Sequence, residues 1–263
     1  MDKITVSAPG KLMLFGEHSV VYNNPSLVTA VNQRMKLILE TTSEETLFLD
    51  AKDVGVLDYV KPLKEIGCGE IPKGARFVEF AIKNINDKYP ITSGLKITST
   101  SDFSSEVGFG SSSASTVCTV FGISTLFNLN LSLKEIFDIS YKTVLDIQGK
   151  GSGFDIASTI YGGILYFVTA GQKIEPLEVN DIPLLVAYSG NKADTTQILN
   201  QVKEKMETHK EGVNEIFKNI SNLVEEAKIA LLEKDWSRLG TLMNFNQDYL
   251  EDLGVSTEKL DDM

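Results

Sequence analysis

Hydrophobic and polar residues alternate along the first 50 positions in short bursts, and this pattern predicts β-strands. The bursts cover residues 4–8, 12–15, 27–31, 36–40 and 46–49, and proline, glycine, asparagine and glutamate separate them. A further strand is expected at 94–99. Several short strands with polar breaks are typical of an antiparallel sheet.

Helical spacing begins later in the chain. Residues 77–87 form one predicted helix, which ends before Tyr89-Pro90. A second predicted helix runs over 112–127, where Ala114, Val117, Cys118 and Phe121 recur at the intervals of one buried stripe. A third begins after Ser132, which we expect to be its N-cap.

The second half of the sequence changes character near residue 182. Strands are expected at 164–168 and around 174–179, and the segment 184–188 reads as a buried strand. Three or four helices follow it, the last starting near Thr257. These patterns predict an α+β protein with an N-terminal domain over 1–178 and a C-terminal domain over 179–263. The last helix shows neither a C-cap nor a stop signal, so we expect the chain to end within an element.

Composition narrows the class of protein. The chain has 263 residues, 42% hydrophobic and 23% charged, which suits a globular protein and excludes a disordered or fibrous one. Its net charge of -11 repels phosphate backbones and anionic headgroups, so neither nucleic acid nor a membrane is an expected partner. Two cysteines are too few for a disulfide framework, and no apolar run approaches the roughly 20 residues that span a bilayer. We expect a cytoplasmic protein.

The first candidate for chemistry is a glycine-rich turn that leads from a strand into a helix. It consists of Gly108, Phe109, Gly110, Ser111, Ser112, Ser113 and Ala114. Glycines let backbone amides approach an anion, and the N-terminus of the helix adds unpaired N–H groups and a favourable dipole. The spacing is neither that of a P-loop nor that of a dinucleotide-binding site. A flexible turn with a serine cap is the alternative.

Two further segments carry charged residues at turns. The segment from Ser7 to His18 holds Lys11, Glu17 and His18, which suit a phosphate or carboxylate, a divalent cation and a hydrogen bond respectively. The segment from Gly149 to Phe154 places glycines and a serine before Asp155, which would allow a rigid seat for a catalytic carboxylate. Ordinary surface charge and a helix N-terminal aspartate are the alternatives.

Taken together and in this order, the three segments resemble the GHMP small-molecule kinases, and most closely the mevalonate kinase family within them. The stretch from Ala8 through His18 to Val31 is similar to the opening signature of that family. Glu106 and Ser104 depart from the common phosphate loop, and Gln148 and Gly151 depart from the common catalytic segment. The variant QGKGSGFDIA is also similar to phosphomevalonate kinases. A third glycine-rich motif that family members carry near the C-terminus is absent from these 263 residues.

The resemblance implies a two-domain GHMP kinase fold: an N-terminal α/β domain of ribosomal-protein-like βαβ type and an incomplete ferredoxin-like C-terminal domain. It also implies ATP as phosphate donor and Mg²⁺ as cofactor. Lys11 would contact the substrate and Asp155, and Glu17 and Ser112 would hold the metal. Asp155 would take or orient the proton of the attacking hydroxyl. His18 and Thr195 would line the alcohol pocket, and residues 108–114 would bind phosphates.

The implied activity is ATP-dependent phosphorylation of the primary hydroxyl of mevalonate, a step of isoprenoid biosynthesis. Phosphomevalonate or another small alcohol is the alternative substrate. A non-catalytic ligand-binding module or a folded fragment is the alternative class, because the third glycine-rich motif is missing. The sequence leaves open whether the chain forms a homodimer.

Overall fold

The computed structural model describes residues 2–190 and 195–261, apart from the side chains of residues 195 and 196. These residues gather into two compact units, each assembled from separate stretches of chain. Unit 1 comprises Met1–Lys11, Val31–Ser105 and Phe109–Tyr161, and unit 2 comprises Leu12–Ala30, Glu106–Gly108 and Gly162–Met263. The domain boundary expected after residue 178 stays a prediction.

Unit 1 contains a mixed sheet in the strand order β4-β3-β5-β2. The strands are β2 (Pro25–Thr42), β3 (Thr46–Ala51), β4 (Val56–Pro62) and β5 (Gly94–Ser101), and β1 (Lys3–Phe15) pairs with β2. β3 and β5 are parallel, whereas β3 and β4, and β2 and β5, are antiparallel. Burial alternates strictly along β3, as the sequence pattern requires of a strand with one face in the core.

The predicted breaks within β1 and β2 were wrong. The expected strands at 4–8 and 12–15 form the single strand β1, and those at 27–31 and 36–40 form the single strand β2. β1 continues through Gly10 because it pairs with β2. The glycine is needed there for close approach, since a Cβ at this position would lie 3.0 Å from the carbonyl oxygen of Phe109. The strand β4 was not predicted at all.

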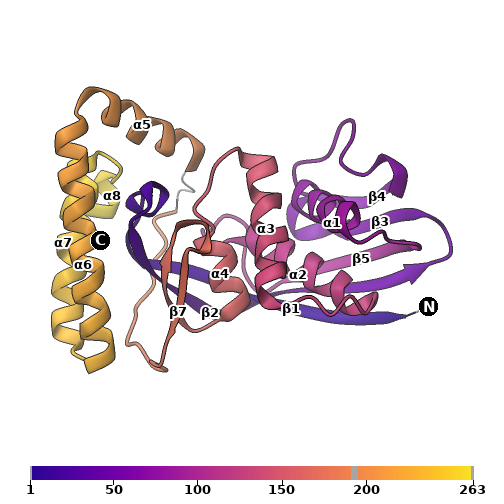
Figure 1. The fold of residues 1–263 in the computed structure, drawn as a ribbon, viewed down its shortest axis with the longest axis horizontal. Helices are drawn as coiled ribbons and strands as arrows, with labels where there is room; N and C mark the ends of the chain where they lie inside the picture. Colours follow the sequence, from indigo (N-terminus) through magenta and orange to yellow (C-terminus); the bar gives the residue numbers. More distant parts are fainter. Residues whose placement is uncertain (1, 191–194, 262–263) are drawn as a thin grey trace. The chain divides into compact units, whose positions relative to one another are not determined.

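Four helices pack together in unit 1. They are α1 (Arg76–Lys88), α2 (Ser111–Leu126), α3 (Leu133–Gln148) and α4 (Phe154–Tyr161), and Figure 1 shows α1, α2 and α3 gathered beside the strands. α2 lies directly against β2, since a Cβ on Gly122 would come within 2.7 Å of the Leu39 side chain. Ser132 caps α3 in a capping box with Glu135, which confirms the predicted N-cap.

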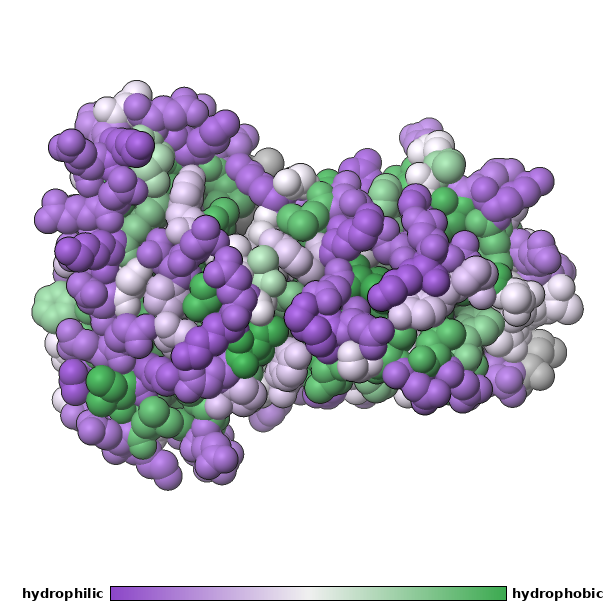
Figure 2. Space-filling model, in the orientation of Figure 1, coloured by the Kyte–Doolittle hydropathy of each residue, from purple (hydrophilic) through white to green (hydrophobic). Residues whose placement is uncertain are grey.

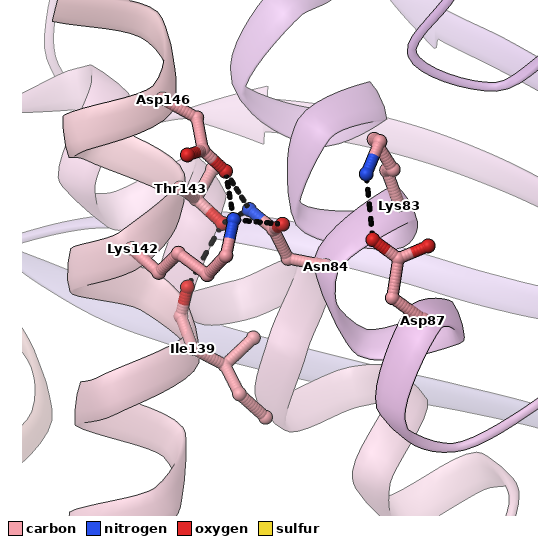
Figure 3. Close-up of polar contacts among 7 residues, drawn as sticks. All are labelled: Lys83, Asn84, Asp87, Ile139, Lys142, Thr143 and Asp146. Carbon is pink, nitrogen blue, oxygen red and sulfur yellow. Dashed lines mark hydrogen bonds and ion pairs between the residues drawn. The ribbon is translucent and has the colours of Figure 1, made fainter. Parts of the chain in front are cut away.

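A polar network joins α1 to α3 (Figure 3). Asn84 on α1 donates through Nδ2 to the Thr143 hydroxyl at 3.0 Å and to Oδ2 of Asp146 at 2.9 Å. Lys142 donates in turn to Oδ1 of Asn84 at 2.9 Å. Because the amide of Asn84 is bonded through both its nitrogen and its oxygen, this network fixes α3 against α1. The C-terminus of α3 leads into the segment that carries Asp155.

The described residues of unit 2 form a small sheet and four α-helices. Residues 25–29 of β2 pair with β6 (Ile164–Val168), which pairs with β7 (Lys173–Leu177), both antiparallel. The helices are α5 (Thr195–Thr208), α6 (Lys210–Glu233), α7 (Trp236–Leu253) and α8 (Glu258–Asp261). α6 and α7 run side by side (Figure 1), and the Leu and Ala residues of α6 bury the sheet face that carries Leu27 and Tyr166.

The strand predicted at 184–188 was wrong. This segment has no regular secondary structure, and Leu185 is 95% exposed. A strand needs a neighbour to accept and donate backbone hydrogen bonds, and no strand of the described chain pairs with it. Hydrophobicity alone therefore gave the wrong element.

The surface of unit 2 is largely hydrophilic on the face that Figure 2 shows. Hydrophilic side chains predominate on the visible face of the C-terminal helices, with single apolar side chains between them (Figure 2). Among the described residues, no helix is both long and apolar enough to cross a membrane. The apolar faces of α6 and α7 instead form the core of unit 2.

Candidate active site

The N-terminus of α2 is built to receive an anion. Gly110 is its N-cap, in the left-handed conformation with φ 75°. A glycine has no side chain that could accept hydrogen bonds from the first-turn N–H groups, and the first turn, Ser111 to Ala114, carries no carboxylate. The positive end of the helix dipole is therefore not neutralised by this turn.

Lys11 lies directly beside this N-terminus. Its backbone N–H donates to the carbonyl oxygen of Phe109 at 3.0 Å, which ties β1 to the glycine-rich turn. Its side chain passes over Gly110 so closely that a Cβ there would lie 3.0 Å from Lys11 Cε. The turn needs glycine at 110 for two reasons, the positive φ and the room for the lysine.

The ammonium group of Lys11 faces Asp155. Nζ lies 3.4 Å from Oδ1 of Asp155 and 5.1 Å from the centre of the Phe154 ring. The Lys11 side chain is 16% exposed and that of Asp155 38% exposed, so both are partly open to a ligand. Oδ1 of Asp155 is itself buried and faces this ammonium. The exposed part of the carboxylate can accept a hydrogen bond from a reacting hydroxyl.

Glycines shape the seat of Asp155. Gly149 ends α3 with φ 73°, and Gly153 has φ 90° immediately before α4. The Tyr141 hydroxyl donates to the carbonyl oxygen of Gly151 at 2.8 Å. A Cβ on Gly153 would lie 3.0 Å from the Tyr141 ring and 3.2 Å from the Phe137 ring. The segment therefore packs its backbone against two aromatic rings, which holds Asp155 rigidly.

We expect Gly153→Ala to destabilise the protein more than Gly149→Ala. Both positions have positive φ, which costs an L-residue about 1–2 kcal/mol. Gly149 faces open space, whereas Gly153 faces the two rings, so only Gly153→Ala adds a steric cost of about 1–3 kcal/mol. Urea unfolding measures both free energies. Equal losses would contradict the close packing at Gly153.

Unit 2 holds Glu17 in a second cluster. Gly16 before it has φ 98°, and a Cβ there would lie 2.7 Å from the Pro25 carbonyl oxygen, so glycine is required. Oε2 of Glu17 accepts a hydrogen bond of 3.0 Å from Nδ2 of Asn246 on α7. A buried amide donor therefore orients the carboxylate.

His18 follows Glu17 in the chain and is half-buried. Burial lowers the pKa of His18 to about 4, because the charged imidazolium would lose its hydration. The ring is therefore neutral at pH 7. Its Nδ1 is buried and meets no hydrogen-bond partner among the described residues. A neutral imidazole with an unused polar atom can donate to or accept from a small polar ligand.

The predicted site residues divide between the two units. Unit 1 brings together Lys11, the loop 109–114 and Asp155. Unit 2 holds Glu17, His18 and Gly108, and a Cβ added to Gly108 would meet no atom within 4 Å. Thr195 is the first residue of α5, and its side chain lies outside the described residues. Within the described ranges, no group of three or more His, Cys, Asp or Glu side chains could hold a metal by itself.

Sequence reasoning missed two residues of these clusters. Phe154 is a cation–π partner of the Lys11 ammonium. Nothing in the sequence pattern distinguished it from the other residues beside Asp155. Asn246 lies 229 residues from Glu17 along the chain. The sequence feature that could have pointed to Asn246 is its place as a polar residue in the apolar stripe of a helix, among the buried Leu239, Leu242 and Leu253.

Comparison with known proteins identifies the class. The family model described as the GHMP kinases N terminal domain matches residues 76–163. The mevalonate kinase of Thermococcus sibiricus is 32% identical over 272 residues, covering 99% of this chain and 81% of the relative. That of Pyrococcus furiosus is 33% identical over 275 residues, with coverages of 99% and 81%. The crystal structure of Methanococcus jannaschii mevalonate kinase matches with a TM-score of 0.79 at 27% identity, covering 99% of this chain and 82% of that one.

The chain belongs to the GHMP kinase family. The three relatives reported above, each matching 99% of this chain, are mevalonate kinases. The resemblance and the α+β fold expected from the sequence are thereby confirmed. Membership of a kinase family favours an enzyme over the ligand-binding module or folded fragment that the sequence left open.

Proposed function

We propose that this protein transfers the γ-phosphoryl group of ATP to the primary hydroxyl of mevalonate. The ion pair of Lys11 with Asp155, beside the N-terminus of α2, carries the proposal. The relatives at 32% and 33% identity, which are mevalonate kinases, support the choice of alcohol. In the reaction, the bond from the γ-phosphorus to the ADP oxygen breaks, and a bond to the mevalonate oxygen forms.

Lys11 and Asp155 act on the attacking hydroxyl. The carboxylate of Asp155, whose side chain is 38% exposed, accepts the hydroxyl hydrogen and either takes the proton or orients it. Lys11 holds that carboxylate in place at 3.4 Å and offers positive charge to the transferring phosphoryl group. Alignment and charge stabilisation are the main requirements of phosphoryl transfer, and this pair supplies both.

The loop 108–114 binds the ATP phosphates. First-turn amides of α2 donate to phosphate oxygens, and the helix dipole favours their negative charge. Ser113 is buried, whereas Ser111 and Ser112 are partly exposed, so the hydroxyls of Ser111 and Ser112 are the ones open to the nucleotide, and the family resemblance favours Ser112. This local field attracts an anion despite the net charge of -11, because salt screens distant surface charges beyond roughly 10 Å.

Glu17 and Ser112, which belong to separate units, are the residues that the family resemblance implies as ligands of a magnesium ion. A carboxylate and a hydroxyl are hard oxygen donors, and the described residues contain no all-protein cage of three acidic or His/Cys ligands. Mg²⁺ is usually held by one or two protein oxygens together with waters and substrate phosphates, which matches so small a donor set. When bound, the ion neutralises charge on the phosphate oxygens.

We expect Ser112→Ala to raise the Mg²⁺ concentration for half-maximal activity by about tenfold. This change corresponds to the loss of one interaction of about 1.4 kcal/mol. Ser115→Ala is the matched control, because the Ser115 hydroxyl donates within α2 to the carbonyl oxygen of Ser112. Titration of Mg²⁺ at saturating ATP measures both. An unchanged Mg²⁺ requirement in Ser112→Ala would remove Ser112 from the metal site.

The activity is tested by coupled ADP release with mevalonate, phosphomevalonate and a panel of sugars. We expect turnover with mevalonate and at least a hundredfold lower kcat/KM with the other alcohols, since a site built for one set of polar groups rejects analogues by about that factor or more. If the protein turned over phosphomevalonate and not mevalonate, phosphomevalonate would be its substrate instead.

His18 and Thr195 are proposed to line the alcohol pocket. A homodimer and a cytoplasmic location stay predictions.

A further inference from the structure

Tyr141 joins α3 to the loop that leads to Asp155. Its hydroxyl donates to the carbonyl oxygen of Gly151 at 2.8 Å, and its ring lies 3.0 Å from where a Cβ on Gly153 would stand. The loop 149–153 has no regular secondary structure, so it lacks the repeating backbone hydrogen bonds of a helix or strand. Gly153 immediately precedes α4, whose first turn carries Asp155. Tyr141 therefore contacts this loop twice, close to the carboxylate.

Tyr141 is itself held in a fixed place. Its ring stacks on that of the buried Phe137, with 5.7 Å between ring centroids and 25° between ring planes. The next two residues, Lys142 and Thr143, belong to the polar network with Asn84 that joins α3 to α1 (Figure 3). Burial raises the pKa of the Tyr141 hydroxyl, so it stays protonated at neutral pH and remains a donor.

The hydroxyl of Tyr141 acts on geometry more than on packing. A phenylalanine at this position would keep the ring contacts with Phe137 and Gly153, and only the bond to the Gly151 carbonyl oxygen would be lost. Asp155 lies beyond that loop, with Oδ1 3.4 Å from Nζ of Lys11. Reacting groups have to be held within about 0.5 Å of their productive positions, so freeing the loop is expected to matter for the reaction.

We propose that Tyr141 is a positioning residue for the phosphoryl-transfer reaction. Through Gly151 and Gly153 it sets the place of the Asp155 carboxylate relative to Lys11 and to the attacking hydroxyl. All of these residues belong to unit 1. This inference rests on the proposed function, because it takes Asp155 as the group that receives the hydroxyl hydrogen. A misplacement of about 1 Å at a reacting group lowers rates by about 100-fold.

Removing the hydroxyl alone tests the proposal. We expect Tyr141→Phe to lower kcat about 10- to 100-fold, because Asp155 is no longer held in place. The KM for ATP should stay within about twofold of the wild type, because the phosphates bind at the N-terminus of α2. Steady-state kinetics with mevalonate measures both quantities. An unchanged kcat in Tyr141→Phe would overturn the proposal.

Tyr89→Phe is the matched control for a general loss of structure. The Tyr89 hydroxyl also bonds to α3, donating to Oε1 of Glu135 at 3.2 Å in the first turn of the helix, at the end away from Asp155. Each variant loses one hydrogen bond, so both melting temperatures should fall by no more than about 4 °C. Only Tyr141→Phe should lose kcat. Equal losses of kcat in the two variants would make Tyr141 a structural residue.

A double-mutant cycle shows whether Tyr141 acts through Asp155. In the Asp155→Asn background, adding Tyr141→Phe should lower the remaining kcat by less than about twofold. Effects that multiply in full would contradict a route through the carboxylate.

A crystal structure of Tyr141→Phe reads the position of Asp155 without any turnover. We expect the carboxylate to move by more than about 0.5 Å from its place 3.4 Å from Nζ of Lys11, and to stay there in Tyr89→Phe. An unmoved Asp155 would overturn the proposal. If the wild type does not turn over mevalonate but Asp155 moves in Tyr141→Phe, the proposed function fails and the role of Tyr141 in placing Asp155 stands.

Discussion

Replacing Asp155 by asparagine is expected to lower kcat about a thousandfold while nucleotide affinity stays within a few-fold of wild type. The substitution keeps the shape of the side chain but removes the negative charge opposite Lys11, and an amide accepts a proton far less readily than a carboxylate. Asp155 does not belong to the phosphate loop at α2, so the binding of ATP should not depend on it. Steady-state kinetics with mevalonate and fluorescence titration with a nucleotide analogue measure the two quantities.

Asp138→Asn is the control for the loss of one negative charge. Asp138 lies on the exposed face of α3 in an ion pair with Lys134, and its removal should leave kcat unchanged. The assignment of Asp155 would be wrong if Asp155→Asn lost affinity and kcat by the same factor, since that would make it a binding residue.

Replacing Lys11 by methionine is expected to lower kcat/KM about 100- to 1000-fold. The methylene stem of Lys11 packs over Gly110, and methionine preserves that packing while removing the ammonium group. Loss of one preorganised donor at the site where charge develops typically has an effect of this size. Melting temperature should change little, because the partly exposed pair with Asp155 is a minor contribution to stability.

Lys96→Met controls for the loss of one positive charge from unit 1, because Lys96 is exposed on β5. The double variant of Lys11→Met with Asp155→Asn should be less impaired than the product of the single effects, since each residue acts through the other. Independent, multiplying effects would show that the 3.4 Å pair has no functional coupling.

Sequence alone predicted the elements that carry the chemistry. The glycine-rich turn into α2, the capping of α3 by Ser132 and the turn before Asp155 follow from local rules about glycine and helix termini. These rules depend on residues that are neighbours in the chain, so a single sequence suffices to apply them. The closeness of Lys11 to Asp155 was expected only through the family resemblance, because 144 positions separate them along the chain, from 11 to 155.

Long-range pairing explains what the sequence did not predict. β1 and β2 continue through residues that look like breaks, because their partners supply hydrogen bonds on the other side of the break. The apolar segment 184–188 lacks such a partner and forms no strand. Asn246 was overlooked for the same reason: its hydrogen bond to Glu17 depends on the fold rather than on the local pattern.

A crystal structure with mevalonate and a non-hydrolysable ATP analogue tests the central claim most directly. The account predicts that the terminal phosphate oxygens accept hydrogen bonds from first-turn amides of α2, and that the primary hydroxyl of mevalonate lies within about 3.2 Å of a carboxylate oxygen of Asp155. Phosphates bound away from Gly110 to Ser113, or a hydroxyl out of reach of Asp155, would contradict it.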